Sequence, residues 1–201
     1  RPEFPRAIYM DDDFKEAAEF HGHTCPGLAI GYRIAKYVKE HYPRSQDEEL
    51  VCIAENKSCS IDAIQFMLGC TAGKGNLLFK DYGKQAFTFY SRDKNKALRI
   101  YFRGGILKGM DELRQKMARG ELGPEDRERM AAFRSQATEK VLSARDEDIL
   151  TVEEVDIPAP EKARIHPSLK CEECGEEFME ILGRTAGGKV LCKSCFERLV
   201  C

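Results

Sequence analysis

Apolar side chains recur at helical spacing through the first third of the chain. Acidic residues at positions 11–13 favour a helix N-terminus and predict a short helix from Asp11 to Phe20. A second helix is predicted from Pro26 to Tyr42, because proline suits a first helical turn and Pro43 stops the pattern. A third helix is predicted over residues 60–68, ending at Gly69.

The middle of the chain alternates β-rich runs with further helical patterns. Strands are predicted for residues 50–56, for 85–92 and 97–103 as an antiparallel hairpin, and for 149–157. Helices are predicted for residues 108–119 and 124–144. In the longer helix Met130, Phe133, Ala137 and Val141 form a stripe, which indicates core packing.

A proline pair divides the chain. Pro158-Ala159-Pro160 breaks regular structure and stiffens the backbone. We therefore expect a core domain over residues 1–157, a linker over 158–170 and a small C-terminal domain over 171–201.

Composition restricts the class of protein. The chain has 201 residues, of which 42% are hydrophobic and 33% charged, and no window approaches the roughly 20 apolar residues that a bilayer span needs. We therefore expect a globular protein and no membrane partner. The formal net charge of -2 gives no global attraction to nucleic acid. Nine cysteines are an odd number and no secretory leader is recognisable, so we expect a reducing, cytoplasmic location.

The strongest chemical signal is a pair of Cys-x-x-Cys motifs near the C-terminus. Cys171-x-x-Cys174 and Cys192-x-x-Cys195 have the spacing of paired metal knuckles, and four thiolates suit a closed, structural zinc site. Disulfides or a rubredoxin-type iron site are the alternatives. A hairpin of residues 178–182 with 189–191 around Gly187-Gly188, followed by a helix over 194–200, resembles a treble-clef zinc finger.

The charges around this predicted finger are balanced. Residues 161–201 carry seven Lys or Arg and seven Asp or Glu. This balance argues against nucleic acid as the partner and favours a protein partner for the finger.

A second candidate site begins at the end of the first helix. His21, His23 and Cys25 alternate, so an extended segment places all three side chains on one side. Cys25 precedes Pro26 at the start of the second helix, where the helix dipole lowers the pKa of a thiol. The segment predicts a metal site or an activated thiol; ordinary structural histidines are the alternative.

A third cluster follows on the third helix. Cys59, Asp62 and Gln65 are spaced about one turn apart, on about the same face. Cys70 and Lys74 come next in a glycine-rich stretch, where Lys74 offers a cation to an anionic ligand. This stretch lacks P-loop spacing, and a simple turn with buried thiols at Cys52 and Cys70 is the alternative.

Together these clusters resemble the FmdE family, named for the E subunit of formylmethanofuran dehydrogenase. The resemblance rests on Phe20-His21-Gly22-His23-x-Cys25-Pro26-Gly27, Cys59-Ser60-x-Asp62-Ala63-x-Gln65, Gly69-Cys70-Thr71-x-Gly73-Lys74-Gly75-Asn76-Leu77 and Asp81-Tyr82-Gly83-Lys84. It covers residues 14–103, with weaker similarity to Ile157, and some members of the family also carry a C-terminal zinc finger. It implies an α+β core of helices on an antiparallel or mixed sheet, dimerisation through that core, and a cleft where the His, Cys and Asp residues converge.

The resemblance does not supply a mechanism. The redox chemistry of that dehydrogenase belongs to a molybdenum or tungsten cofactor on its other subunits. Whether this chain is itself an enzyme therefore stays open.

Two hypotheses follow for the function. In the first, the protein serves one-carbon or molybdenum/tungsten enzyme metabolism, including methanogenesis-related chemistry. A second metal is then held by His21, His23 and Cys59, while Cys25 or Cys70 adds a soft ligand or nucleophile and Asp62 orients a histidine or moves a proton. Lys74, Cys70 and Gln65 are the expected cofactor-binding residues. In the second hypothesis, the chain is a non-enzymatic adaptor or regulator whose finger docks a protein, with nucleic acid as the lesser alternative, and the core cysteines are structural.

Overall fold

The computed structural model describes residues 12–107 and 111–200. Within them the chain forms two compact units, which divide between Lys162 and Ala163. The division falls inside the stretch 158–170 that the sequence predicts as a linker. No helix in the described ranges is long and apolar enough to cross a membrane.

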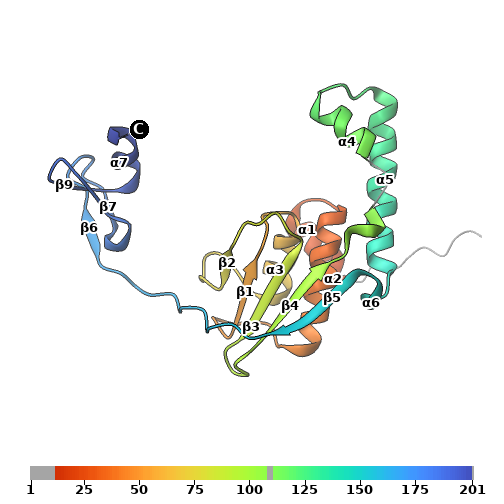
Figure 1. Cartoon of the computed structure of the whole chain (residues 1–201), viewed down its shortest axis with the longest axis horizontal. Coiled ribbons are helices and arrows are strands. Elements are labelled where there is room, and N and C mark those ends of the chain that lie inside the picture. The colour runs from red at the N-terminus through yellow and green to blue at the C-terminus, as the bar shows by residue number, and fades with distance from the viewer. Residues whose placement is uncertain (1–11, 108–110, 201) are drawn as a thin grey trace, which may run out of the picture. The chain divides into compact units, whose positions relative to one another are not determined.

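The first unit has five strands and six α-helices among the described residues (Figure 1). The helices are α1 (Asp12–His21), α2 (Pro26–His41), α3 (Ser60–Leu68), α4 (Asp111–Ala118), α5 (Pro124–Ser143) and α6 (Asp146–Ile149), with a 3₁₀ turn η1 at Gly104–Leu107. The strands are β1 (Leu50–Ala54), β2 (Leu77–Phe79), β3 (Ala86–Ser91), β4 (Lys96–Phe102) and β5 (Leu150–Val155). The α+β architecture is confirmed, and most elements lie within a few residues of their predicted bounds. Residues 11 and 108–110 of two predicted helices lie outside the described residues.

The sheet is mixed, with strand order β2-β1-β3-β4-β5. The predicted β3–β4 hairpin is present, and Ser91 pairs with Lys96 at its closed end. Strand β2 was not predicted from the sequence; it pairs with β1 in parallel through Cys52 and Leu77. Parallel neighbours need a crossover, and α3 supplies it.

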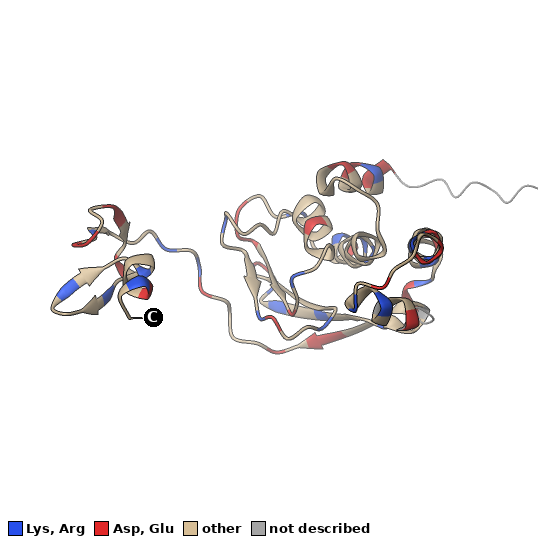
Figure 2. Cartoon of the chain, turned by 90° about the horizontal axis from the view of Figure 1, so that it is seen from above, with Lys and Arg blue, Asp and Glu red and all other residues tan. Residues whose placement is uncertain are grey.

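Helices α1–α3 cover one face of the sheet, as the view from above shows (Figure 2). The largest buried cluster combines their inner faces with alternate residues of the strands, including Leu50, Cys52 and Ala54 of β1. Alternation along a strand places these side chains on the helix-covered face. Val51 points the other way and packs with Tyr90 and Ala97 on the opposite face.

The stripe on α5 is buried in two separate places. Met130 and Phe133 pack with Leu113 of α4, whereas Val141 joins the main core. Arg33 of α2 fixes the end of α5 by donating from Nη1 to the carbonyl oxygens of Val141 and Leu142 at 2.7 and 2.9 Å. This buried guanidinium ties two helices that are far apart in sequence.

The second unit consists of two small hairpins and a helix. Strands β6 (Ser168–Lys170) and β7 (Glu177–Met179) pair, the 3₁₀ turn η2 (Glu180–Leu182) follows, strands β8 (Arg184–Ala186) and β9 (Lys189–Leu191) pair, and helix α7 (Lys193–Val200) ends the unit. The predicted pairing of residues 178–182 with 189–191 is therefore wrong. Gly187 and Gly188 both have positive φ and close a tighter turn, so that β9 pairs with β8.

Candidate functional site: two clusters of metal-ligand side chains

The described residues contain two groups of side chains with metal-ligand geometry. One comprises Cys171, Cys174, Cys192 and Cys195, and the other comprises His21, His23, Cys25 and Cys59. In each group the four ligand atoms all lie within 4.8 Å of one another. Tetrahedral zinc with sulfur and nitrogen ligands separates its donors by about 3.3–3.8 Å, so small shifts close either group around an ion.

In the C-terminal cluster the backbone prepares the sulfur atoms for a cation. The N–H of Cys192 donates to the Cys171 sulfur at 3.3 Å. The N–H groups of Cys174 and Cys192 lower the pKa of Cys171 to about 6. Arg198 of α7 donates from Nη2 to the Cys195 sulfur at 2.9 Å. The thiolate, which is the form that zinc binds, is thereby favoured at Cys171, whereas burial raises the pKa of Cys195 despite the contact with Arg198.

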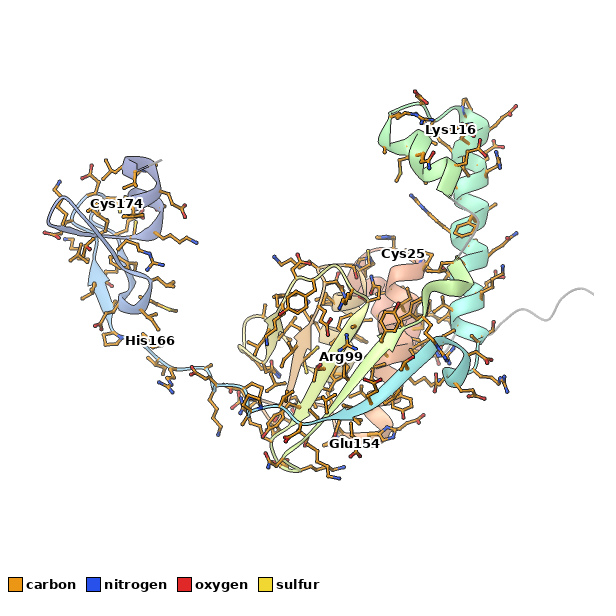
Figure 3. The ribbon with its side chains drawn as sticks, in the orientation of Figure 1. Cys25, Arg99, Lys116, Glu154, His166 and Cys174 are labelled. Atoms are coloured by element: carbon orange, nitrogen blue, oxygen red, sulfur yellow. The ribbon has the colours of Figure 1, made fainter. Side chains whose placement is uncertain are left out.

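The N-terminal cluster, called the core cluster below, is built where three helices end or begin. His21 is the last residue of α1, Cys25 is the N-cap of α2, and Cys59 precedes α3. The backbone N–H of Leu28 donates to the Cys25 sulfur at 3.3 Å, so this thiol takes the place of a capping oxygen. Figure 3 shows Cys25 at the end of α2.

A carboxylate holds one of the two histidines. His21 Nδ1 lies 2.6 Å from Asp62 Oδ2, and the His21 side chain is only 9% exposed. Its Nε2 faces the Cys25 sulfur at 3.9 Å. With Nδ1–H donating to the carboxylate, Nε2 is the free acceptor and the natural metal-binding atom.

Gln65 extends this arrangement by one turn of α3. Its Nε2 donates to Asp62 Oδ1 at 3.4 Å, while its Oε1 accepts from the Ala72 N–H at 3.4 Å. The sequence analysis expected Gln65 to bind a cofactor. The structure places it behind the carboxylate that holds His21.

Close packing of α2 against α3 fixes the distance between the two cysteines. A Cβ added at Gly27 would lie 3.1 Å from Cys59 Cβ, and one added at Gly31 would lie 2.2 Å from the Ser60 carbonyl oxygen. Gly27 is part of the motif that carries the family resemblance, but neither it nor Gly31 has a role predicted from the sequence. Their spacing of four residues, on one face of a helix, is the signal that points to a close helix crossing.

The electrostatics of the core cluster favour a protonated thiol at Cys59 when no metal is bound. Burial raises the pKa of Cys59, and the neighbouring Cys25 raises it further. A metal ion replaces that proton with a stronger positive charge.

Two expected ligand residues do not join the core cluster. Cys70 is fully buried and donates its S–H to the Leu50 carbonyl oxygen at 3.5 Å. Lys74 donates from Nζ to the carbonyl oxygens of Ser45 and Gln46 at 3.4 and 3.3 Å. Both are engaged with the backbone, so the geometry does not support a cofactor-binding role for either.

The glycine-rich stretch is organised by Asn76 instead. Its side chain is fully buried, accepts from the Thr71 N–H at 2.9 Å and donates to the carbonyl oxygens of Leu50 and Asp47 at 2.9 and 3.0 Å. The sequence analysis assigned no role to Asn76. A lone asparagine in a turn gives little sequence signal for such a network.

Comparison with known proteins gives each of the two units a family match of its own. Residues 20–151 match the family described as FmdE, molybdenum formylmethanofuran dehydrogenase operon. This match covers more than half of the chain. The chain belongs to the FmdE family.

The C-terminal unit of this FmdE protein has its own match. Residues 166–200 match the prokaryotic dksA/traR C4-type zinc finger. The match and the four clustered cysteines support structural zinc, as the sequence predicts. Residues 168–170, expected in the linker, form strand β6 of this finger.

Two individual proteins resemble the FmdE chain over most of its length. A protein of Archaeoglobus fulgidus, called probable S-adenosyl-L-methionine-binding protein, is 31% identical over 175 residues, which are 81% of this chain and 48% of that protein. The chain thus spans about half the length of this curated relative. The crystal structure of a tungsten formylmethanofuran dehydrogenase FmdE-like protein from Syntrophus aciditrophicus has a TM-score of 0.60 at 23% identity, covering 99% of this chain and all of that one. It shows that the two proteins share a fold.

Proposed function

We propose that the core cluster of this FmdE protein binds a transition-metal ion and that this metal site carries the function of the protein. His21, His23, Cys25 and Cys59 are the proposed ligands. The observation that carries the proposal is the 2.6 Å contact between His21 Nδ1 and Asp62 Oδ2, because metal-binding histidines usually donate their other N–H to a carboxylate or carbonyl oxygen. Two imidazoles and two thiolates suit zinc among the common ions.

The chain's own residues divide the work at such a site. Cys59 and Cys25 supply thiolates that bind the metal or, where a substrate displaces one of them, act as nucleophiles. Asp62 orients the His21 ring through their hydrogen bond. The same carboxylate accepts a proton from His21 or returns one to it. A bound metal supplies Lewis-acid polarisation of a ligand.

We place this site in one-carbon or molybdenum/tungsten enzyme metabolism. The FmdE family description and the name of the Archaeoglobus relative support this placement, because S-adenosylmethionine is a one-carbon donor. S-adenosylmethionine is accordingly the first ligand to test, by calorimetric titration of the metal-loaded full chain.

Metal analysis tests the proposal directly. Reduced wild-type protein should carry two metal ions per chain, Cys59→Ser one in the finger, and Cys192→Ser one in the core. Cys70→Ala is the matched control, since Cys70 lies outside both clusters, and it should retain two. One ion per chain in the wild type, with no change in Cys59→Ser, contradicts the proposal.

The exposed apolar side chains of the finger favour a second function, that of an adaptor. Met179, Ile181 and Leu182 are 54%, 60% and 50% exposed around η2. The finger carries charges of both signs (Figure 2), which suits a protein partner better than nucleic acid.

Substitutions in this apolar patch test the adaptor function. Met179→Glu with Ile181→Glu should abolish cross-links to the protein partner without changing zinc content, whereas Lys189→Glu should leave the cross-links intact. Salt-dependent retention of DNA or RNA by the full chain would replace this protein partner by nucleic acid.

Dimerisation through the core is a further part of the proposal. The family resemblance implies it. Sedimentation equilibrium of wild type and of a chain ending at residue 162 should give twice the monomer mass for both.

A further inference from the structure

The two histidines of the core cluster are held very differently. His21 is largely buried and bonded to Asp62. His23 is exposed, and within the described part of the chain no hydrogen bond reaches its ring. Its ring lies against that of His21, with centroids 4.4 Å apart and planes tilted by 38°.

Of the four proposed ligand residues, His23 also has the least constrained backbone. His21, Cys25 and Cys59 sit at helix termini, whereas His23 lies in the short turn between α1 and α2. The preceding Gly22 has φ of +92°, and a Cβ built there would meet nothing within 4 Å. The ring can therefore leave the cluster without disturbing the packing of a helix.

From this asymmetry we infer that His23 is an exchangeable ligand and that a planar nitrogen heterocycle takes its coordination position. The inference rests on the proposed metal site. Catalytic zinc sites keep three protein ligands and one exchangeable position, and a ligand without a second hydrogen bond is the weakest one. His21, Cys25 and Cys59 are then the three ligands that stay bound to the metal.

The surroundings of that position indicate the class of ligand. The site accepts an imidazole nitrogen there, and a replacing ring takes over the tilted ring contact with His21. Phe20 precedes His21 on α1, is 57% exposed and has its ring centroid 5.8 Å from that of Phe66, so this end of α1 also exposes aromatic surface. Two thiolates neutralise a divalent ion, so a neutral ring nitrogen completes the site without excess charge.

Cobalt substitution of the full chain tests the inference, with imidazole as the probe. Subtracting the spectrum of Cys59→Ser isolates the visible bands of core cobalt, and the four-cysteine finger, a closed site, is the internal reference. His23→Ala should bind core cobalt no more than about tenfold more weakly than wild type and should regain the wild-type spectrum when imidazole is added. Imidazole should also shift the core bands of wild type, at higher concentration.

Two matched variants make the result decisive. His21→Ala should lose core cobalt by well over about a hundredfold, since both the ligand and its carboxylate support are lost. Thr24→Ala, an exposed neighbour, should behave like wild type. The inference is overturned if His23→Ala loses cobalt as completely as His21→Ala, or if imidazole leaves the core bands of wild type and His23→Ala unchanged. Absence of core bands from wild type itself contradicts the proposed metal site, and with it this inference.

Discussion

The two clusters place a similar set of ligand atoms in opposite structural settings. The finger's buried apolar cluster consists of Cys171, Leu191, Cys192 and Cys195, so three of its four members are also metal ligands. The core cluster lies at the ends of helices that pack on a sheet through a large apolar cluster of their own. In the finger a structural zinc ion organises the fold, whereas in the core the fold organises the proposed metal site.

The two clusters also differ in net charge. Four thiolates around zinc leave a net charge of about -2 in the finger, and the N–H of Cys192 and the guanidinium of Arg198 offset part of it. In the proposed core site, two thiolates neutralise a divalent ion and two imidazoles add no charge. A closed, shielded site suits a structural ion, and a neutral site with an exposed histidine suits ligand exchange.

Removal of a finger ligand should have the largest effect. Cys192→Ser should unfold residues 163–201, because structural zinc contributes about 10–16 kcal/mol to the folding of such segments. Backbone amide spectra should show collapse of the finger signals while those of the core persist. Cys59→Ser should leave both sets dispersed. A folded finger in zinc-free protein would remove the contrast between the two clusters.

A change at the helix crossing should test whether the core site is preformed. Gly31→Ala places a Cβ 2.2 Å from the Ser60 carbonyl oxygen, so α2 and α3 must separate. We expect a loss of about 1–3 kcal/mol in unfolding free energy, measured by urea denaturation. Weaker core metal binding should accompany it. Gly73→Ala, with open space around its Cβ, should stay within about 0.5 kcal/mol of wild type.

Loss of the carboxylate behind His21 should weaken metal binding in the core site and leave metal binding in the finger unchanged. Asp62→Asn keeps the size of the side chain but removes the charge that orients the ring, and should weaken core metal binding by about 10–100-fold. Competition with a chromophoric chelator measures this affinity, and finger zinc should be unchanged. Equal affinities in wild type and variant would show that Asp62 does not support the ligand.

A buried thiol outside both clusters should produce the smallest effect. Burial raises the pKa of Cys70 to about 12, above the value of about 8.5 for an unfolded thiol. Its contribution to stability is therefore complete below the unfolded pKa and is lost as the pH rises toward 12. Urea unfolding between pH 8 and pH 10 should show wild type losing up to about 1.4 kcal/mol per pH unit more than Cys70→Ala. Parallel curves would contradict the assignment.

The sequence predicts which residues carry the chemistry of this protein better than it predicts which residues contact one another in the fold. The alternation of His21, His23 and Cys25 predicts a local group of ligands, because those residue types act at short spacings, whereas the convergence of Cys59 on them is what the family resemblance implies. The approach of Gly31 to Ser60 and the network of Asn76 depend on segments brought together only by the fold.

Pairing in the finger shows the same limit. The segment at Phe178 has a strand-like pattern, but its partner is the short polar run Ser168–Lys170, which resembles a linker. A three-residue strand carries too little pattern to identify its partner. The sequence therefore predicts the right cysteines and the wrong hairpin.

The contact between Gly31 and Ser60 also limits how this site can evolve. Because backbone meets backbone where α2 crosses α3, no smaller side chain can narrow the gap between Cys25 and Cys59, and a larger residue at Gly31 can only force the two helices apart. Descendants that keep this crossing can change which ion or ligand the proposed site favours by replacing a ligand residue or altering the His23 turn. Diversification of the family should accordingly concentrate in that turn.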